Sequence, residues 1–290
     1  MNSLLKVEHL TKRYKNFTLQ DISFEIPEGF ICGYVGPNGA GKTTTLDLST
    51  HLRKASEGEA YVGGLRFRDD PVEYRNRIGY IGDSAYFPRE FTPKMIRSVL
   101  KDFYPSFDPD RFVKYCDAWE LKEKQKVKEM SRGTIVKLMF AAVLSRDSRL
   151  LILDEATNGL DPVVRRDVLH LLQEYIADGK HSVLFSTHIM EDLQGIADYI
   201  FLLDRGKKVL FEAKDDLQEQ YLMVRCGRGD LTEEVRSHLI GVDTGEFGIS
   251  ALFPTDANVI LPSGILTEKP SIDEIVVHLL SERKRLSILQ

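Results

Sequence analysis

The chain carries the segment Gly36-Pro37-Asn38-Gly39-Ala40-Gly41-Lys42-Thr43-Thr44. It fits the phosphate-loop pattern, with the first glycine at 36 and the last at 41, after a short apolar run and before a possible helix start at Lys42. Backbone N–H groups of residues 39–44 would cradle phosphate oxygens at the positive end of that helix. Lys42 would reach the β- and γ-phosphates, and the Thr43 hydroxyl would bind Mg²⁺. The stretch therefore predicts a nucleotide site; a purely structural glycine-rich turn is the alternative.

Two carboxylates follow a second apolar run, in Leu150-Leu151-Ile152-Leu153-Asp154-Glu155. The run predicts a buried strand that delivers both acids to its carboxyl end, where ligands bind in parallel sheets. Asp154 would hold Mg²⁺, directly or through water, and Glu155 would act as general base on a water that attacks the γ-phosphate. A helix cap with a solvated partner is the alternative for such a pair, and the phosphate loop upstream favours catalysis.

The rest of the chain alternates apolar runs with helical patterns. Further buried strands are expected at 183–185 and 200–203, and amphipathic helices at 135–143 and 164–175. Residues 22–26 alternate apolar and polar side chains, as in a half-buried strand. The alternation predicts an α/β fold with a parallel sheet covered by helices on both faces.

We expect a main domain at 1–215, a mainly helical insertion within it at about 88–145, and a small α+β appendage at 216–290. A final helix is expected at 272–280. In the appendage, loops are expected at the glycines, which are Gly227, Gly229, Gly241, Gly245 and Gly248.

Composition narrows the class of protein. Hydrophobic residues make up 42% of the 290 residues, far more than in a disordered chain. The net charge is −5, from 39 basic and 44 acidic residues, so we expect no nucleic-acid partner. No apolar run approaches the roughly 18 residues that a membrane-spanning helix needs. The three cysteines are too few and too scattered to predict a disulfide framework or a zinc cluster.

A segment upstream of the acidic pair gives the first likeness to a known family. Met130-Ser131-Arg132-Gly133-Thr134 opens the expected helix at 135–143, and Ser131 lies 23 residues before Asp154. A serine and a small residue at a helix start can bind an anion. In this place the ATP-binding subunits of ABC transporters usually carry Leu-Ser-Gly-Gly-Gln, which the segment resembles. The resemblance makes Ser131 and Gly133 the phosphate-facing pair.

Further matches follow in the family's order. Residues 156–161 resemble the D-loop, with Asp161 as its aspartate. His188, 33 residues after Glu155, resembles the switch histidine that contacts the γ-phosphate. Tyr14 resembles the aromatic residue that stacks on adenine. The resemblance covers about residues 4–213 and implies a P-loop NTPase (RecA-like) core with an N-terminal antiparallel β subdomain.

The sequence departs from the family pattern at two places. Asp83 follows the expected strand 77–82, where the family has glutamine. An aspartate still offers an oxygen to Mg²⁺, so Asp83 is a third candidate metal ligand. It lacks the amide that glutamine would provide for coupling the nucleotide site to the permease. Arg132 replaces a small residue, and Thr134 replaces a glutamine. We expect Arg132 to point to solvent; added attraction for the nucleotide is the alternative.

The resemblance implies an ATPase subunit that uses ATP and Mg²⁺ and powers transport through a separate membrane permease, at the cytoplasmic face of the membrane. A second ATP-binding subunit, identical or different, would close head to tail on the first. The stretches 103–108, 131–133 and 269–272 resemble Gram-positive export subunits, including exporters of antimicrobial or toxin-like peptides. Two alternatives stay open: a soluble ABC ATPase without a transport role, and a degenerate half of a heterodimer that binds ATP but hydrolyses it poorly.

Overall fold

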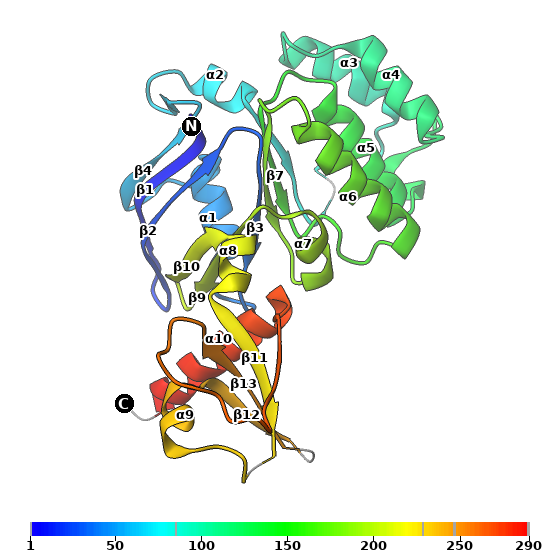
Figure 1. Ribbon diagram of the computed structural model, residues 1–290. Coiled ribbons are helices and arrows are strands. Elements are labelled where there is room, and N and C mark those ends of the chain that lie inside the picture. Colours follow the sequence, from blue (N-terminus) through cyan, green and yellow to red (C-terminus); the bar gives the residue numbers. More distant parts are fainter. Residues whose placement is uncertain (1, 85, 228, 246–247, 289–290) are drawn as a thin grey trace.

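The computed structural model describes residues 2–84, 86–227, 229–245 and 248–288. A central sheet lies between an N-terminal sheet on one side and helices on the other, and a smaller unit with its own sheet lies at the C-terminal end (Figure 1). This is the fold class that the sequence predicts: a P-loop NTPase core, an N-terminal antiparallel sheet, a helical insertion and a small α+β appendage.

The central sheet has the strand order β10-β9-β3-β8-β7-β6. Its members are parallel except β10, which pairs antiparallel with β9. The strands are β3 (Ile31–Val35), β6 (Ile78–Ile81), β7 (Leu150–Asp154), β8 (Ser182–Ser186), β9 (Tyr199–Asp204) and β10 (Lys207–Ala213). The order places β3 and β7 on either side of β8, so the phosphate loop and the acidic pair leave the same edge of the sheet.

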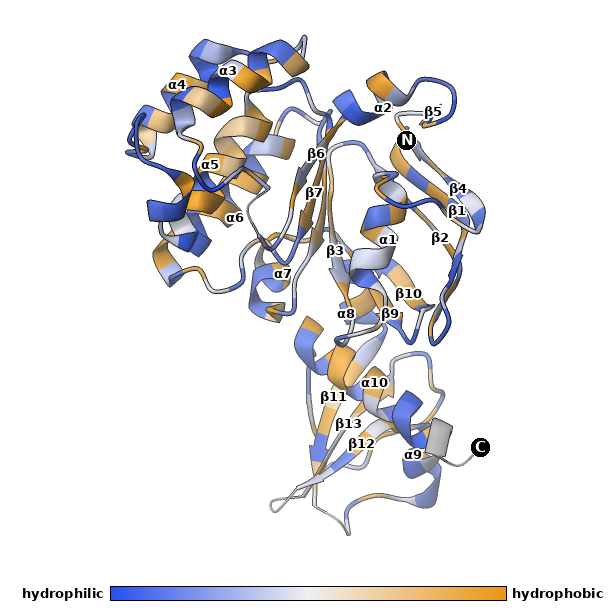
Figure 2. Ribbon diagram, turned by 180° about the vertical axis from the view of Figure 1, so that it is seen from behind, coloured by the Kyte–Doolittle hydropathy of each residue, from blue (hydrophilic) through white to orange (hydrophobic). Residues whose placement is uncertain are grey.

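Both faces of this sheet are buried, which explains the unbroken apolar runs in the sequence. Along β7, Leu151 and Leu153 pack into one core and Leu150 and Ile152 into another. Such alternation follows from the two-residue period of a strand. Figure 2 shows the hydrophobic colouring of the central strands between their covering layers. Helices fill the first core, and the N-terminal sheet with α1 fills the second. The helices of these two layers are α1 (Lys42–Ser49), α5 (Arg132–Leu144), α6 (Pro162–Ile176) and α7 (Met190–Ile196).

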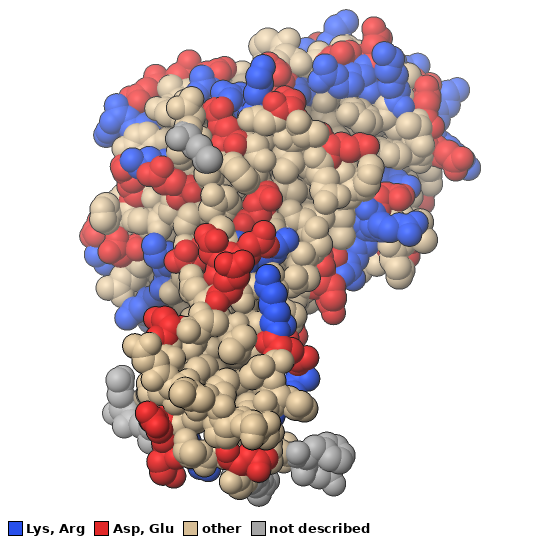
Figure 3. Space-filling view, in the orientation of Figure 1, with Lys and Arg blue, Asp and Glu red and all other residues tan. Residues whose placement is uncertain are grey.

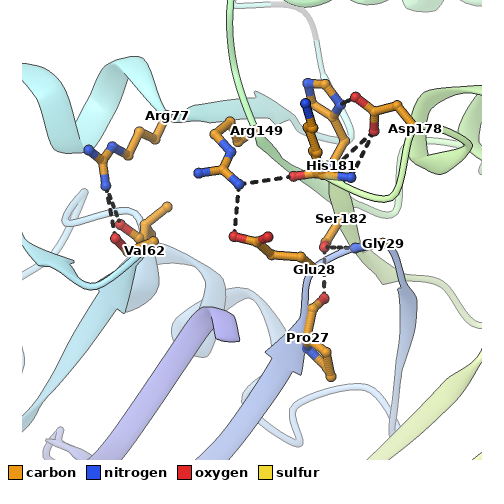
Figure 4. Close-up of polar contacts among 11 residues, drawn as sticks. Pro27, Glu28, Gly29, Val62, Arg77, Arg149, Asp178, His181 and Ser182 are labelled. Atoms are coloured by element: carbon orange, nitrogen blue, oxygen red, sulfur yellow. Dashed lines mark hydrogen bonds and ion pairs between the residues drawn. The ribbon is translucent and has the colours of Figure 1, made fainter. Parts of the chain in front are cut away.

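Polar contacts tie the N-terminal sheet to the central sheet at the end away from the phosphate loop. Its strand order is β2-β1-β4-β5, with bounds β1 (Ser3–Arg13), β2 (Thr18–Pro27), β4 (Glu57–Val62) and β5 (Leu65–Arg66). The Ser182 hydroxyl donates to the Pro27 carbonyl at 2.8 Å, and Arg149 pairs with Glu28 at 2.8 Å (Figure 4). Arg77 donates to the Val62 carbonyl at 3.2 Å in the same region. These contacts fix the two sheets together.

The helical insertion packs around an apolar cluster that includes Ile96, Phe112 and Leu138. Its elements are α3 (Pro93–Phe103), α4 (Pro109–Ala118), a 3₁₀ turn (Val127–Glu129) and the first part of α5. The short helix α2 (Pro71–Asn76) precedes β6. Figure 3 shows side chains of both charges interspersed over α3 and α4, and acidic side chains gathered over α8. The insertion presents a mixed, solvated surface on that face.

The C-terminal part contains a sheet of order β12-β13-β11-β14 covered by a long helix. Its elements are α8 (Lys214–Glu219), β11 (Tyr221–Cys226), α9 (Glu233–His238), β12 (Ile240–Gly245), β13 (Gly248–Pro254), β14 (Leu266–Glu268) and α10 (Ile272–Ile288). Helix α10 begins where the sequence predicts a final helix and is longer than expected.

The expectation of loops at the appendage glycines is wrong at Gly241, Gly245 and Gly248, which lie in β12 and β13. Gly241 has a φ of 63°, and a Cβ there would lie 2.0 Å from the His278 carbonyl oxygen. Glycine is needed at this point because α10 approaches the strand closely. The glycine that suggested a loop at 241 is therefore needed for the close approach of the α10 backbone to β12.

Candidate active site

The phosphate loop connects β3 to α1 in the predicted strand–loop–helix arrangement. A Cβ at Gly36 would lie 2.3 Å from the Leu203 carbonyl oxygen, so the chain passes too close to β9 for any side chain. Gly41 precedes α1 with a φ of 111°, a backbone conformation that favours glycine. The Ala40 N–H donates to the Pro37 carbonyl at 3.0 Å inside the loop.

Lys42 lies in this loop with only 8% of its surface exposed. Its ammonium Nζ donates to the Gly36 carbonyl at 2.7 Å and lies 3.6 Å from Oε1 of Glu155. A buried ammonium needs such partners because its desolvation is costly. Phosphate oxygens entering the loop would offer the same charge in place of the carboxylate.

Glu155 is the residue on which the site converges. Its Oε2 accepts from the Asn158 amide at 2.7 Å and lies 2.9 Å from Nδ1 of His188. Its backbone N–H donates to the Ser186 carbonyl at 2.9 Å, which ties it to the end of β8. The structure therefore brings Lys42, Glu155 and His188 together.

Asp154 ends β7 with 6% of its surface exposed. Its Oδ1 is buried and has no hydrogen-bond partner in the described part of the chain. Burial raises the pKa of Asp154, opposed by the Thr43 hydroxyl and reinforced by the charge of Glu155. A buried carboxylate oxygen without a partner is costly, and a hard divalent cation prefers oxygen ligands of this kind. The donor set of Thr43 and Asp154 fits Mg²⁺.

Ser131, Gly133 and Asp161 lie at the starts of two helices. The Ser131 hydroxyl caps α5 by accepting from the Thr134 N–H at 3.2 Å, and Ser131 is exposed. Asp161 caps α6 by accepting from the N–H groups of Val163 and Val164, each at 3.1 Å. Both side chains therefore have a structural role at a helix start, where an anion would also be stabilised.

Arg132 is exposed, as expected, but its side chain also contacts two groups of the chain. One of its guanidinium nitrogens, Nη2, lies 2.6 Å from Oδ1 of Asp83, and its Nε donates to the backbone carbonyl of Asn158. No local pattern predicts this contact, since 49 positions separate the two charged residues. The two departures from the family pattern are thus in contact with each other.

Tyr14 lies beyond the end of β1, in a turn in which its N–H donates to the Phe17 carbonyl at 2.8 Å. The Tyr14 side chain is 37% exposed. The Phe17 ring packs against Gly41, since a Cβ at that glycine would lie 2.8 Å from Phe17 Cζ. The turn therefore lies against the phosphate loop, with an aromatic ring at the surface.

Comparison with known proteins decides the family. Residues 19–158 match the family described as ABC transporter. The chain is 31% identical to the ABC transporter ATP-binding protein YtrB of Bacillus subtilis (strain 168), over 77% of this chain and 76% of that protein. The chain belongs to the ABC transporter ATP-binding proteins. As a member of this family it binds ATP and is an ATPase.

Two further similarities agree with this assignment. A solved structure described as an ATP binding subunit of an ABC transporter matches with a TM-score of 0.69 and 26% identity, over 75% of this chain and 93% of that one. The bacitracin transport ATP-binding protein BcrA of Enterococcus faecalis is 28% identical, over 72% of this ABC protein and 69% of that one. Within its described residues, this ABC protein has no helix long and apolar enough to span a membrane.

Asn158 is the residue of this ABC protein's site that sequence reasoning missed. It lies inside the segment 156–161 that resembles the D-loop, three positions after Glu155. That spacing placed an amide within reach of the carboxylate as the chain turned after β7. Its backbone carbonyl also accepts a hydrogen bond from Nε of Arg132, a contact that no local pattern predicted.

Proposed function

We propose that this ABC ATPase couples ATP hydrolysis to transport, in the export direction, through a separate membrane permease at the cytoplasmic face of the membrane. The observation that carries the proposal is the arrangement around Glu155. Its carboxylate lies between Lys42 of the phosphate loop and His188, beside the buried unpaired oxygen of Asp154. This arrangement combines a phosphate-binding cation, a base and a metal ligand at one sheet edge.

Thr43 and Asp154 would hold Mg²⁺ in this site. The ion supplies positive charge that neutralises the β- and γ-phosphates. Asp83 stays a predicted third ligand on the resemblance alone, because in this structure its carboxylate is engaged by Arg132. The proposal for the metal therefore stands on the buried oxygen of Asp154 and the neighbouring threonine.

Each remaining group has a separate task in the proposed reaction. Glu155 would accept a proton from the attacking water, while Asn158 and His188 keep its carboxylate in place. Lys42 would release Glu155 and bind the β- and γ-phosphates, a charge-assisted contact. Tyr14 would stack on the adenine, since its ring is exposed beside the phosphate loop.

We also propose that two ATP-binding subunits pair head to tail, as a homodimer or a heterodimer. Ser131, Gly133 and Asp161 of one subunit would complete the phosphate site of the other. This is supported by the exposure of Ser131 and Asp161 at helix starts, which favour anions. Head-to-tail pairing of this kind closes a two-fold dimer around two nucleotides.

The permease would dock in a groove between the core and the helical insertion. The groove has a volume of about 430 Å³ and is lined by apolar and aromatic side chains, among them Tyr80, Tyr86, Leu100 and Tyr104, with Asp83 at the same wall. A short amphipathic helix is the kind of element that such a groove receives. Export is favoured by the resemblance to export subunits and by the similarity to a bacitracin transport protein.

The test is to express the chain together with the membrane protein encoded beside its gene, purify the complex by a tag on the chain, and place it in inside-out vesicles. We expect co-purification and ATP-dependent accumulation of substrate inside the vesicles. Hydrolysis by a chain that captures no membrane protein would support the soluble alternative. ATP binding without hydrolysis by the complete complex would support the degenerate alternative.

A further inference from the structure

Asp83 and Arg132 are two of the positions at which the chain departs from its family's pattern, and their side chains contact each other. Nη2 of Arg132 lies 2.6 Å from Oδ1 of Asp83. Asp83 follows β6, whereas Arg132 is the first residue of α5. The pair therefore links the end of β6 in the central sheet to the start of α5, the last helix of the insertion.

The same arginine makes a second contact, toward the reacting groups. Its Nε donates to the backbone carbonyl of Asn158. The side-chain amide of Asn158 donates to Oε2 of Glu155 at 2.7 Å, and that oxygen also contacts His188. A continuous series of polar contacts thus runs from Asp83 through Arg132 and Asn158 to the glutamate.

Arginine suits this position better than lysine. A planar guanidinium can donate to a carboxylate and a carbonyl at once from fixed directions, whereas a lysine offers one compact ammonium. The neighbouring Gly159 has a φ of 66°, and a Cβ there would lie 3.4 Å from Nε of Arg132. That φ favours glycine, and it lets the chain turn next to the arginine.

We infer that Arg132 is a positioning residue for Glu155, and that Asp83 holds Arg132 in the orientation that this requires. The inference rests on the proposed role of Glu155 as general base. Arg132 fixes the backbone at Asn158, and Asn158 fixes the carboxylate; neither residue touches the nucleotide in this role. Placement of a base by such contacts affects turnover more than substrate binding, since it is needed only in the reaction step.

The pair contributes little to the stability of the fold. The side chains of Arg132 and Asp83 are 40% and 63% exposed, and exposed ion pairs are weak. Removing either one should therefore leave the chain folded. A loss of turnover in such a variant would report on the site.

The experiment measures kcat and KM for Mg²⁺-ATP hydrolysis by the full chain and by Arg132→Ala, Asp83→Asn and the double variant. We expect Arg132→Ala to lower kcat about fivefold with KM changed less than about twofold. Asp83→Asn should lower kcat less than Arg132→Ala does, because Arg132 can still donate its hydrogen bond to the Asn158 carbonyl. The double variant should match Arg132→Ala alone, since both substitutions act through one arginine. Arg132→Lys should recover part of the loss.

A matched control is the pair Arg66 and Asp69, which is also exposed and has an N–O distance of 2.7 Å, but lies at β5 in the N-terminal sheet. Arg66→Ala should leave kcat unchanged. Unchanged kcat in Arg132→Ala, or losses that multiply in the double variant, would overturn the inference. Glu155→Gln in the same assay separates the two claims. If it abolishes turnover while Arg132→Ala does not, only the positioning role is wrong; if it hydrolyses normally, the proposed base is wrong and the positioning role with it.

Discussion

Glu155 adopts a backbone conformation that most side chains avoid, with a φ of 54°. A left-handed non-glycine residue costs free energy and is retained where the surrounding structure requires it. Here the backbone N–H bonds to β8 while the side chain turns back to Lys42 and His188. The sequence predicts that Asp154 and Glu155 lie at the end of one strand. It does not predict the backbone turn at Glu155, because that turn is held by the hydrogen bond to Ser186 of β8.

Lys42→Ala should weaken ATP binding and turnover together. The substitution removes a charge-assisted contact to the β- and γ-phosphates, and such hydrogen bonds contribute about 1.5–3 kcal/mol. Affinity for a fluorescent ATP analogue, measured by titration, should fall about 10-fold or more. Lys124→Ala, at an exposed lysine of the insertion, is the control and should bind normally. Unchanged affinity and hydrolysis in Lys42→Ala would remove the lysine from the site.

Asp154→Asn should stabilise the nucleotide-free chain at neutral pH. Because burial raises the folded-state pKa of Asp154, its ionised form is less favourable in the folded state than in the unfolded chain. Its contribution to stability is greatest at low pH and is lost as the pH rises through the unfolded pKa toward the folded one. The amide removes this charge and keeps an oxygen that can accept from the Thr43 hydroxyl.

Thermal unfolding without Mg²⁺ checks this, and we expect a rise of about 2 °C. Mg²⁺-ATP should then raise the melting temperature of the natural chain more than that of the variant, because binding stabilises by mass action. A lower melting temperature for the variant without Mg²⁺ would contradict the argument that the buried, ionised carboxylate destabilises the folded chain.

Among the helices and strands, those that pack against a core were predictable from the sequence. The central strands appear as unbroken apolar runs because both faces of the sheet are covered. The helices α5 and α6 were predicted from the helical spacing of their apolar residues. The strands β12 and β13 were not, because their glycines are typical of turns; in the structure Gly241 of β12 allows the close approach of α10, and Gly248 of β13 that of the Cys226 carbonyl. The Asp83–Arg132 contact was not either, since it joins two elements far apart in the sequence.

Ser131→Ala separates a helix cap from a phosphate-binding group. Loss of the cap of α5 should cost about 1 kcal/mol of stability. Thr92 caps α3 in the same way, accepting from the Met95 N–H at 3.4 Å, so Thr92→Ala is the matched control. Both variants should lose similar stability in urea unfolding, but only Ser131→Ala should lose ATPase activity. Equal activity in the two variants would leave Ser131 with the capping role alone.

At the scale of the whole molecule, one apolar core crosses the predicted boundary at residue 215. Leu217, Met223 and Ile275 of the C-terminal part pack in the same core as Leu193 and Ile200. A hydrogen bond crosses the same boundary, from the Ile272 N–H to Oε1 of Gln194 at 2.9 Å. The division at residue 215 therefore stays a prediction, and the C-terminal part is packed onto the ATPase core.

Glu155→Gln should accumulate as a closed dimer when ATP and Mg²⁺ are present. With hydrolysis blocked, the γ-phosphate stays between the phosphate loop of one subunit and Ser131 of the other, so ATP shifts the population toward the closed state. Size-exclusion chromatography should show a dimer with ATP and a monomer with ADP. If the subunit works only as half of a heterodimer, the dimer should form only when the partner is added.

The rate of ATP hydrolysis by Glu155→Gln at saturating Mg²⁺-ATP tests most directly whether Glu155 is the general base. The glutamine keeps the size and the contact with His188 but cannot accept a proton. We therefore expect the rate of hydrolysis to fall roughly 10²- to 10⁴-fold, with ATP binding retained. Glu191→Gln, at an exposed residue in the first turn of α7, is the control and should hydrolyse normally. Hydrolysis by Glu155→Gln at the rate of the natural chain would show that Glu155 is not the base.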